Sequence, residues 1–424
     1  MLTNLLIFLF AMFLAASIVF AIWSRNIRKK AIIKAAPIEN IPARQWTTEF
    51  LESKRKMTDP IADEVINIIM QKGEENSVNS LFGSITKDGE QIPADLPDEV
   101  RAYFEKTAIL PDWADKDLIA LGQNIYTRHG VLITILLAYK ALPECYACPK
   151  GAMVLFHTAR LNEQSGSLDA FSRRIAETSE FIYYAMKPGG LLPDGKGIRA
   201  AQKVRLIHAV VRYFLRQNEW DVSLYDEPIN QEDLAGTLMS FSALILEGLE
   251  TMGVDLSAED KEAYTHCWRV IGHIMGVDDD IIPVNAADSI ALGHAIQNHQ
   301  IGASMQGNEL IKALINFQNK HTPSFMDYEI NVEMMRFLMG DTIADLLNVP
   351  PANKQDVERL ANKVKGYVNI GEKLDHTRLL LLIIQGFNKI LLEIQINQLD
   401  KGGVLNFYIP ESLTKDWSVK SNEN

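Results

Sequence analysis

The neighbours of His208 say the most about possible chemistry in this sequence. At helical spacing Val204 and Val211 share its face, so the imidazole projects from the apolar side of a helix. Arg205 lies three residues before it and Arg212 four residues after it. A neutral imidazole in an apolar wall could bind a haem iron while the two arginines bind the propionates. A core histidine with satisfied hydrogen bonds fits the same pattern, and the residues alone favour that interpretation.

Arg174 and Thr178 form a second polar pair, one helical turn apart on the preceding stretch. Phe171, Ile175 and Ile182 define the apolar stripe of that stretch. Thr178 lies on the stripe and Arg174 borders it. An arginine so placed usually reaches solvent or pairs with a carboxylate. The functional alternative is a polar contact inside a ligand pocket.

Cys145 and Cys148 form a C-x-x-C pair, but the chain has only three cysteines, so no second pair completes a zinc site. Pro149 follows instead of histidine, which excludes a covalent haem-attachment motif. Because Pro149 suits the first turn of a helix, that helix could lower a nearby thiol pKa and support a redox role. Packing or incidental thiols are the favoured interpretation.

The other histidines do not indicate a metal centre. None of the nine has a glutamate three residues before it, which excludes the usual helical di-iron signature. His266 and His273 share a helix face, and His294 and His299 are five residues apart. Neither spacing is diagnostic of a metal site, so we interpret these four as structural or surface residues.

The elements that must position these residues are helices. Apolar residues recur at three-to-four spacing, and no series of short alternating strands occurs. Asn230 with Asp233, and Ser257 with Asp260, resemble helix N-caps. The predicted helices cover about 60–73, 114–129, 131–142, 150–162, 168–187, 198–218, 230–252, 258–276, 284–299, 303–320, 353–368 and 375–396.

The N-terminus predicts a membrane anchor. Residues 5–23 are apolar except for Ser17 and would form a helix of roughly 28 Å, enough to cross a hydrocarbon core. Five basic residues follow between 25 and 34 and none precedes, which is the reverse of a signal peptide. The positive flank places the body on the cytoplasmic side. A signal peptide or a buried core helix remains the alternative. The apolar run 379–384 is too short to span.

Composition excludes several classes of protein. The 424 residues are 47% hydrophobic, which is ample for a packed core and excludes wholesale disorder. A net charge of −12 argues against nucleic acid as a partner. We predict an anchor at 1–30, a linker at 31–56, an all-helical catalytic domain at 57–400 and a tail at 401–424.

Six stretches carry a resemblance to a known family. In the same order over roughly 57–350, the chain resembles the catalytic domains of the ER-bound oxygenase MpaB of mycophenolic acid biosynthesis and of the latex-clearing protein (rubber oxygenase). The stretches are DPIADEVI at 59–66, LPDWADKDLIALGQ at 110–123, RRIAET at 173–178, KVRLIHAVVRYFL at 203–215, PINQEDLAGTLMSFS at 228–242 and AYTHCWRVIGHIMGVDDDIIP at 263–283.

The resemblance implies a globin-like, all-α oxygenase domain that binds haem b non-covalently. It places the axial iron ligand at His208 and the pocket residues at Arg174 and Thr178. Two departures matter. Glu177 stands where the rubber-cleaving members have a lysine, and no acid occupies the place of their catalytic glutamate. His157 lies near that place and could accept a proton instead, or could have a core role.

The sequence therefore predicts a membrane-anchored, haem-b-dependent oxygenase of a lipophilic substrate, isoprenoid or lipid-like, with O2 as co-substrate. Oxidative cleavage of a C=C bond is one candidate reaction. His208 is the predicted iron ligand, supported by Arg205 and Arg212. The alternatives are a non-enzymatic haem-binding or sensor protein of the same fold, or a helical scaffold without a cofactor. The oligomeric state stays open.

Overall fold

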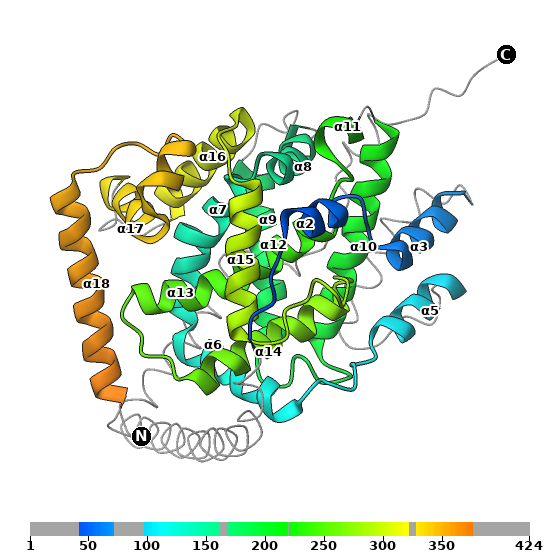
Figure 1. The fold of residues 1–424 in the computed structure, drawn as a ribbon, viewed down its shortest axis with the longest axis horizontal. Helices are drawn as coiled ribbons and strands as arrows, with labels where there is room; N and C mark the ends of the chain where they lie inside the picture. Colours follow the sequence, from blue (N-terminus) through cyan, green and yellow to red (C-terminus); the bar gives the residue numbers. More distant parts are fainter. Residues whose placement is uncertain (1–41, 72–96, 161–167, 219, 322–327, 376–424) are drawn as a thin grey trace, which may run out of the picture.

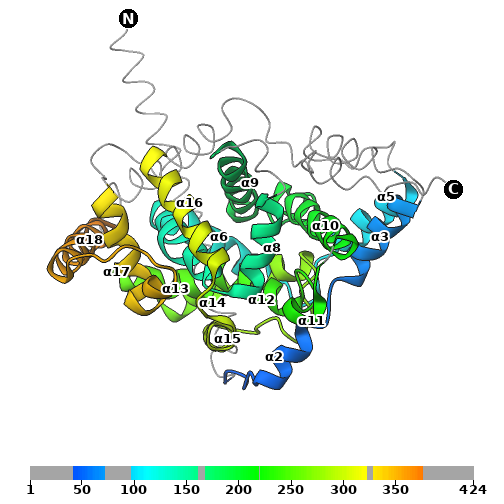
Figure 2. The same ribbon diagram turned by 90° about the horizontal axis from the view of Figure 1, so that it is seen from above.

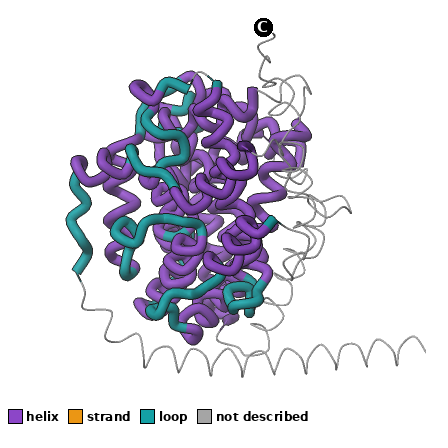
Figure 3. Tube along the Cα trace, turned by 90° about the vertical axis from the view of Figure 1, so that its right-hand side faces the viewer, coloured by secondary structure: helices purple, strands orange, loops and turns teal. Residues whose placement is uncertain are grey.

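The computed structural model describes residues 42–71, 97–160, 168–218, 220–321 and 328–375. Across these ranges every regular element is a helix and there is no strand (Figures 1 and 3). The all-α class expected from the periodicity is confirmed. The predicted anchor at 1–30, the tail at 401–424 and residues 376–396 of the last predicted helix, which include the apolar run 379–384, lie outside the described residues.

Most of the longer helices lie close to the predicted ranges, but the helices at Asp98–Thr107 and Tyr328–Leu346 were not predicted. Both predicted N-caps are present. The side chains of Asn230 and Ser257 accept hydrogen bonds from the backbone N–H of Asp233 and Asp260. The elements are α2 (Thr48–Lys54), α3 (Pro60–Gln71), α5 (Asp98–Thr107), α6 (Lys116–Leu136), η1 (Leu137–Ala141), α7 (Leu142–Tyr146), α8 (Pro149–Arg160), α9 (Leu168–Met186), α10 (Lys196–Gln217), α11 (Val222–Tyr225), α12 (Gln231–Phe241), α13 (Ala243–Thr251), α14 (Ala258–Ile274), α15 (Ala286–Gln300), α16 (Met305–His321), α17 (Tyr328–Leu346) and α18 (Lys354–Asp375).

Two predicted boundaries were wrong. The helix expected over 230–252 is divided at Ser242, whose φ of −111° and ψ of −80° are not helical. The two helices expected over 114–142 form one continuous path through α6 and the π-helical segment η1. Pro143 follows η1 and would clash with the carbonyl four residues earlier in a regular helix. The wider π turn gives that carbonyl room.

The core is built around the pairing of α6 with α14. A Cβ atom at Gly122 of α6 would lie 2.3 Å from the carbonyl oxygen of Ala263 and 2.6 Å from the sulfur of Cys267, both on α14. Only glycine therefore permits this close crossing. Nearby, Trp268 stacks on Phe241 with ring centroids 5.2 Å apart. These contacts lie in one large buried apolar cluster that fixes α14 behind the helices of the candidate site.

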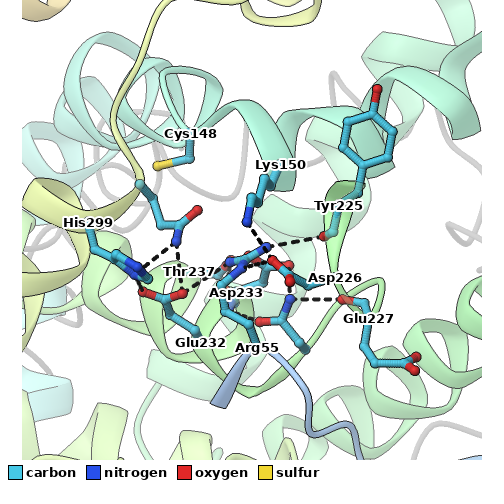
Figure 4. Close-up of polar contacts among 12 residues, drawn as sticks. Arg55, Cys148, Lys150, Tyr225, Asp226, Glu227, Glu232, Asp233, Thr237 and His299 are labelled. Carbon is cyan, nitrogen blue, oxygen red and sulfur yellow. Dashed lines mark hydrogen bonds and ion pairs between the residues drawn. The ribbon is translucent and has the colours of Figure 1, made fainter. Parts of the chain in front are cut away.

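Salt bridges hold the segment that leads into α3 against the body. Arg44 contacts Asp288 at 2.8 Å, and Lys54 contacts Asp278 at 3.0 Å. Arg55 is fully buried among three carboxylates (Figure 4). Residues 48–54, which the sequence placed in a linker, thus form α2 and dock on the body.

His299 of α15 also links α2 to the body, through ion pairs that require its imidazole to be protonated. Its Nδ1 lies 2.6 Å from Glu232 (Figure 4). Its Nε2 lies 2.9 Å from Glu52 of α2. Two carboxylates on the two ring nitrogens require the imidazolium. Burial lowers the pKa of His299, but hydrogen bonds and the charges of both carboxylates raise it more, so the net shift is upward.

We expect the stabilisation from His299 to be complete below its ordinary pKa of about 6.5 and to disappear as pH rises through the raised folded value. Urea unfolding at pH 6 and pH 9 should show wild type losing up to about 1 kcal/mol more than His299→Gln over this interval. Equal pH dependence in both proteins would contradict the assignment.

No single helix in the described ranges is long and apolar enough to cross a membrane. By length and composition one bent pair reaches the threshold, formed by residues 116–146 and 149–158 at 102° to each other.

Candidate functional site

The hairpin of α9 and α10 brings Arg174 and His208 to about one level. The two helices meet where a Cβ atom at Gly197 would lie 2.5 Å from the Cα of Ala185. Arg174 lies eleven residues before Ala185, and His208 lies eleven residues after Gly197. Each is therefore about 16 Å along its helix from the contact point. Figure 2 shows α8, α9 and α10 in the same part of the molecule, and Val154 of α8 shares a small apolar cluster with Val211 of α10.

His208 faces the junction of two apolar clusters. Its neighbour Val204 packs on the main core, whereas Val211 packs on a small cluster that includes Val154 of α8. The Nδ1 atom of His208 is buried and has no hydrogen-bond partner among the described residues. Burial and the charge of Arg212 lower the pKa of His208 to about 4, although Asp59 opposes the shift. The imidazole is therefore neutral at physiological pH, as a metal ligand must be.

The arginines beside His208 have protein partners. Arg205 forms a bidentate ion pair with Asp59, with Nε–Oδ2 at 2.5 Å and Nη2–Oδ1 at 2.8 Å. Arg212 donates from Nε to Asp63 at 2.7 Å. Its Nη2 is buried and has no acceptor within the described part of the chain. The charge of Arg205 is thus balanced by Asp59, whereas Arg212 keeps an open donor.

Arg174 and Thr178 lie on α9 as the spacing predicted. The Thr178 hydroxyl donates to the carbonyl oxygen of Arg174 at 2.9 Å and is exposed. The Arg174 side chain is half-buried, and its guanidinium makes no hydrogen bond or ion pair with the described residues. Its charge acts on the buried phenol of Tyr146. The pair therefore offers an available cation and a hydroxyl lone pair.

His157 lies on α8 and contacts the chain that follows α10. Its ring contacts Trp220 edge-to-face, with centroids 5.7 Å apart, just beyond the end of that helix. The structure therefore brings His208 about level with Arg174, with Thr178 one helical turn nearer the contact point. It places His157 against Trp220 of the small apolar cluster.

A small cavity lies between α3 and α10. At about 70 Å³ it has room for a few water molecules only. It does not include His208. Its lining consists of Asp63, Asn67, Ala209, Tyr213, Arg216 and Gln217.

Comparison with known proteins assigns the chain to a family. Residues 137–367 match the family model described as the catalytic domain of the ER-bound oxygenase mpaB/B' and rubber oxygenase, and this match spans more than half of the chain. This chain belongs to that family. Membership confirms the resemblance drawn from the six stretches and confirms that the protein is an oxygenase.

Two known proteins are similar to this family member over most of its length. The rubber oxygenase of Streptomyces sp. (strain K30) is 26% identical over 305 residues, which cover 71% of this chain and 72% of that protein. The solved structure of latex clearing protein LCP in the closed state matches with a TM-score of 0.67 at 23% identity. The match covers 78% of this chain and 90% of the other, and it shows a shared fold.

The two thiols of the C-x-x-C pair in this rubber oxygenase family member have raised pKa values, which lowers their reactivity. Cys145 lies 3.1 Å from the hydroxyl of Ser240, and Cys148 donates to the carbonyl of Glu144 at 3.7 Å. Burial raises the pKa of Cys145 to about 11 and also raises that of Cys148. The pKa lowering considered from Pro149 is therefore wrong, because desolvation outweighs any effect of the helix end.

We expect both thiols to stay reduced and unreactive in the folded protein. With a pKa near 11, about one Cys145 in a thousand is a thiolate at pH 8, so labelling should be slow until the chain is unfolded. The variant with Cys145→Ala and Cys148→Ala should keep the absorption spectrum of the wild type. Loss of a bound cofactor from a folded double variant would contradict this prediction.

The sequence reasoning missed Asp59 and Asp63. The two acids lie four residues apart at the start of α3, and each pairs with one of the arginines that flank His208. The signal was present, because Asp59 opens the first stretch of the family resemblance. The partner of each acid lies about 150 positions away in the chain and could not be inferred from spacing.

Proposed function

We propose that this chain is a membrane-anchored, haem-b-dependent oxygenase that acts on a lipophilic substrate such as an isoprenoid or lipid chain. The observation that carries the proposal is the buried Nδ1 of His208, which has no partner among the described residues and lies at about the level of Arg174. A neutral imidazole with an available nitrogen is the form that ligates haem iron. The residues present therefore fit haem b, whose iron His208 would bind.

We assign separate roles at this site to several residues of the chain. A haem held by His208 would supply the activation of O2. Arg212 has an open Nη2 donor for a propionate. Arg205 is held by Asp59, so we assign it a supporting role in place of direct contact. Arg174 and Thr178 supply a cation and a hydroxyl that orient oxygen and substrate. His157 is a candidate proton acceptor.

The substrate class rests on the relatives and on the anchor. A curated relative is named rubber oxygenase, which supports a polyisoprene-like chain. A body tethered to the bilayer also meets membrane-dissolved molecules at high local concentration. Glu177 and the missing acid near His157 separate this chain from the rubber-cleaving pattern. We therefore propose an isoprenoid or lipid substrate, with oxidative cleavage of a C=C bond as the candidate reaction.

An absorption spectrum of the purified full-length protein tests cofactor binding. A Soret band that persists through gel filtration is the expected result, and its absence after reconstitution with haemin would reject the haem. Oxygen consumption is then measured with polyprenyl lipids and with soluble polar compounds. Consumption with the lipids supports the oxygenase. Bound haem without turnover of any substrate would favour the sensor alternative.

We also propose a single membrane pass with the body on the cytoplasmic side. The support is the apolar run 5–23 with five basic residues after it and none before it. Protease added to intact cells or spheroplasts should leave the body whole, and detergent should make it cleavable. Digestion from outside without detergent would reverse the topology.

A further inference from the structure

A buried ion pair joins three helices one turn away from His208. Arg205 and Asp59 are 6% and 2% exposed as side chains, and two hydrogen bonds of 2.5 and 2.8 Å link them. The remaining end of the guanidinium donates from Nη1 to the carbonyl of Ile274 at 3.0 Å. The pair thus ties the middle of α10 to the start of α3 and to the last turn of α14.

The backbone after α14 is shaped around this pair. Gly276 has a φ of +80°, a conformation that side-chain-bearing residues rarely adopt. A Cβ atom there would lie 2.5 Å from Nε of Arg205 and 2.5 Å from Oδ2 of Asp59. A larger residue at this position would therefore displace the ion pair itself.

A second ion pair lies on the other side of His208 along α10. Arg212 bonds to Asp63 at 2.7 Å, four residues after Asp59 on α3. The two arginines are seven residues apart on α10, two turns of the helix, and His208 lies between them. One contact would leave α10 able to pivot, whereas two contacts on opposite sides of His208 fix its rotation against α3.

We propose that Asp59, acting through Arg205, is a positioning residue that sets the direction of the His208 imidazole toward its ligand. This inference rests on the proposed function of His208 as the iron ligand. A rotation of α10 by about 10° would move a side-chain atom about 5 Å from the helix axis by about 1 Å. Metal–ligand distances are held within about 0.2 Å, so loss of this ion pair would misplace the ligand.

The test needs variants that disturb the pair from different sides. Asp59→Asn removes the carboxylate charge and leaves a buried guanidinium uncompensated. Arg205→Lys keeps the charge but loses the two-pronged contact, and it serves if the first variant does not fold. Gly276→Ala pushes on the pair from α14. The matched control is Asp288→Asn, another fully buried aspartate paired with an arginine, on α15.

Two measurements separate positioning from plain stability. Haem titration and electron paramagnetic resonance of the ferric protein report affinity and axial ligation. Hydrogen exchange of the haem-free protein reports the order of α10. We expect Asp59→Asn, Arg205→Lys and Gly276→Ala to weaken haem at least tenfold, to alter the ferric signal and to speed exchange around His208. Asp288→Asn should lower stability and leave all three measurements unchanged.

The proposal is overturned if Asp59→Asn, or Arg205→Lys in its place, keeps wild-type haem affinity and an unaltered ferric signal. If the wild type itself binds no haem, the proposed function fails instead. Hydrogen exchange then decides the positioning: faster exchange around His208 supports it, and unchanged exchange overturns it.

Discussion

Replacing His208 with alanine is expected to abolish haem binding while the helices stay intact. The imidazole is neutral, and its Nδ1 is buried with no partner in the described chain, so the variant loses the proposed iron ligand without losing a hydrogen bond from Nδ1. Changes to partners of a metal ligand already cost 10–100-fold in affinity, so loss of the ligand should cost at least about 100-fold. Soret absorbance after haemin titration measures the loss, and far-UV circular dichroism checks the fold.

Three variants serve as controls for His208→Ala. His266 is a buried histidine that accepts the backbone N–H of Asp115 at 2.9 Å, so its alanine variant should lose stability and keep haem. Arg174→Ala and Thr178→Ala should also keep haem, since neither residue is a proposed iron ligand, but should impair oxygen consumption. Full haem occupancy with an unchanged spectrum in His208→Ala, together with loss in His266→Ala, would show that the ligand was wrongly assigned.

Among single substitutions in the segment that precedes α3, Arg55→Met is expected to cause the largest loss of stability. Arg55 is fully buried and lies 2.5 Å from Asp226, 3.1 Å from Glu232 and 3.0 Å from Asp233 (Figure 4). Its removal leaves carboxylates without their buried counter-charge. Breaking such a pair costs about 3–5 kcal/mol, and urea unfolding at pH 7 measures that loss.

The pH dependence of this loss has a definite sign. Burial raises the pKa of Glu232 and of Asp233 even with Arg55 present. Without the arginine both carboxyls protonate more readily, so the deficit of Arg55→Met should shrink as pH falls toward 4. Lys312→Met, in an exposed pair with Glu309, is the control and should cost less than about 0.5 kcal/mol. A loss below about 1 kcal/mol for Arg55→Met would contradict the buried network.

The sequence by itself determined the features that depend on residues close together in the chain. The caps at Asn230 and Ser257 lie within four residues of the groups they bind, so spacing predicted them. The apolar face of His208 follows from the 3.6-residue repeat, and α10 has nearly the predicted bounds. The all-α class and the family could be read in the same way, because both rest on patterns that persist along the chain.

Only the tertiary structure decided which distant groups meet. The propionate role inferred for Arg205 depended on its charge being available, and Asp59, 146 residues away, already balances it. The sequence suggested that the helix beginning at Pro149 could lower the pKa of the Cys148 thiol. Burial among other elements raises that pKa instead. Periodicity shows which face of a helix is apolar but not what that face contacts. The partners of buried charges depend on how helices pack, and packing joins residues whose separation in sequence carries no signal.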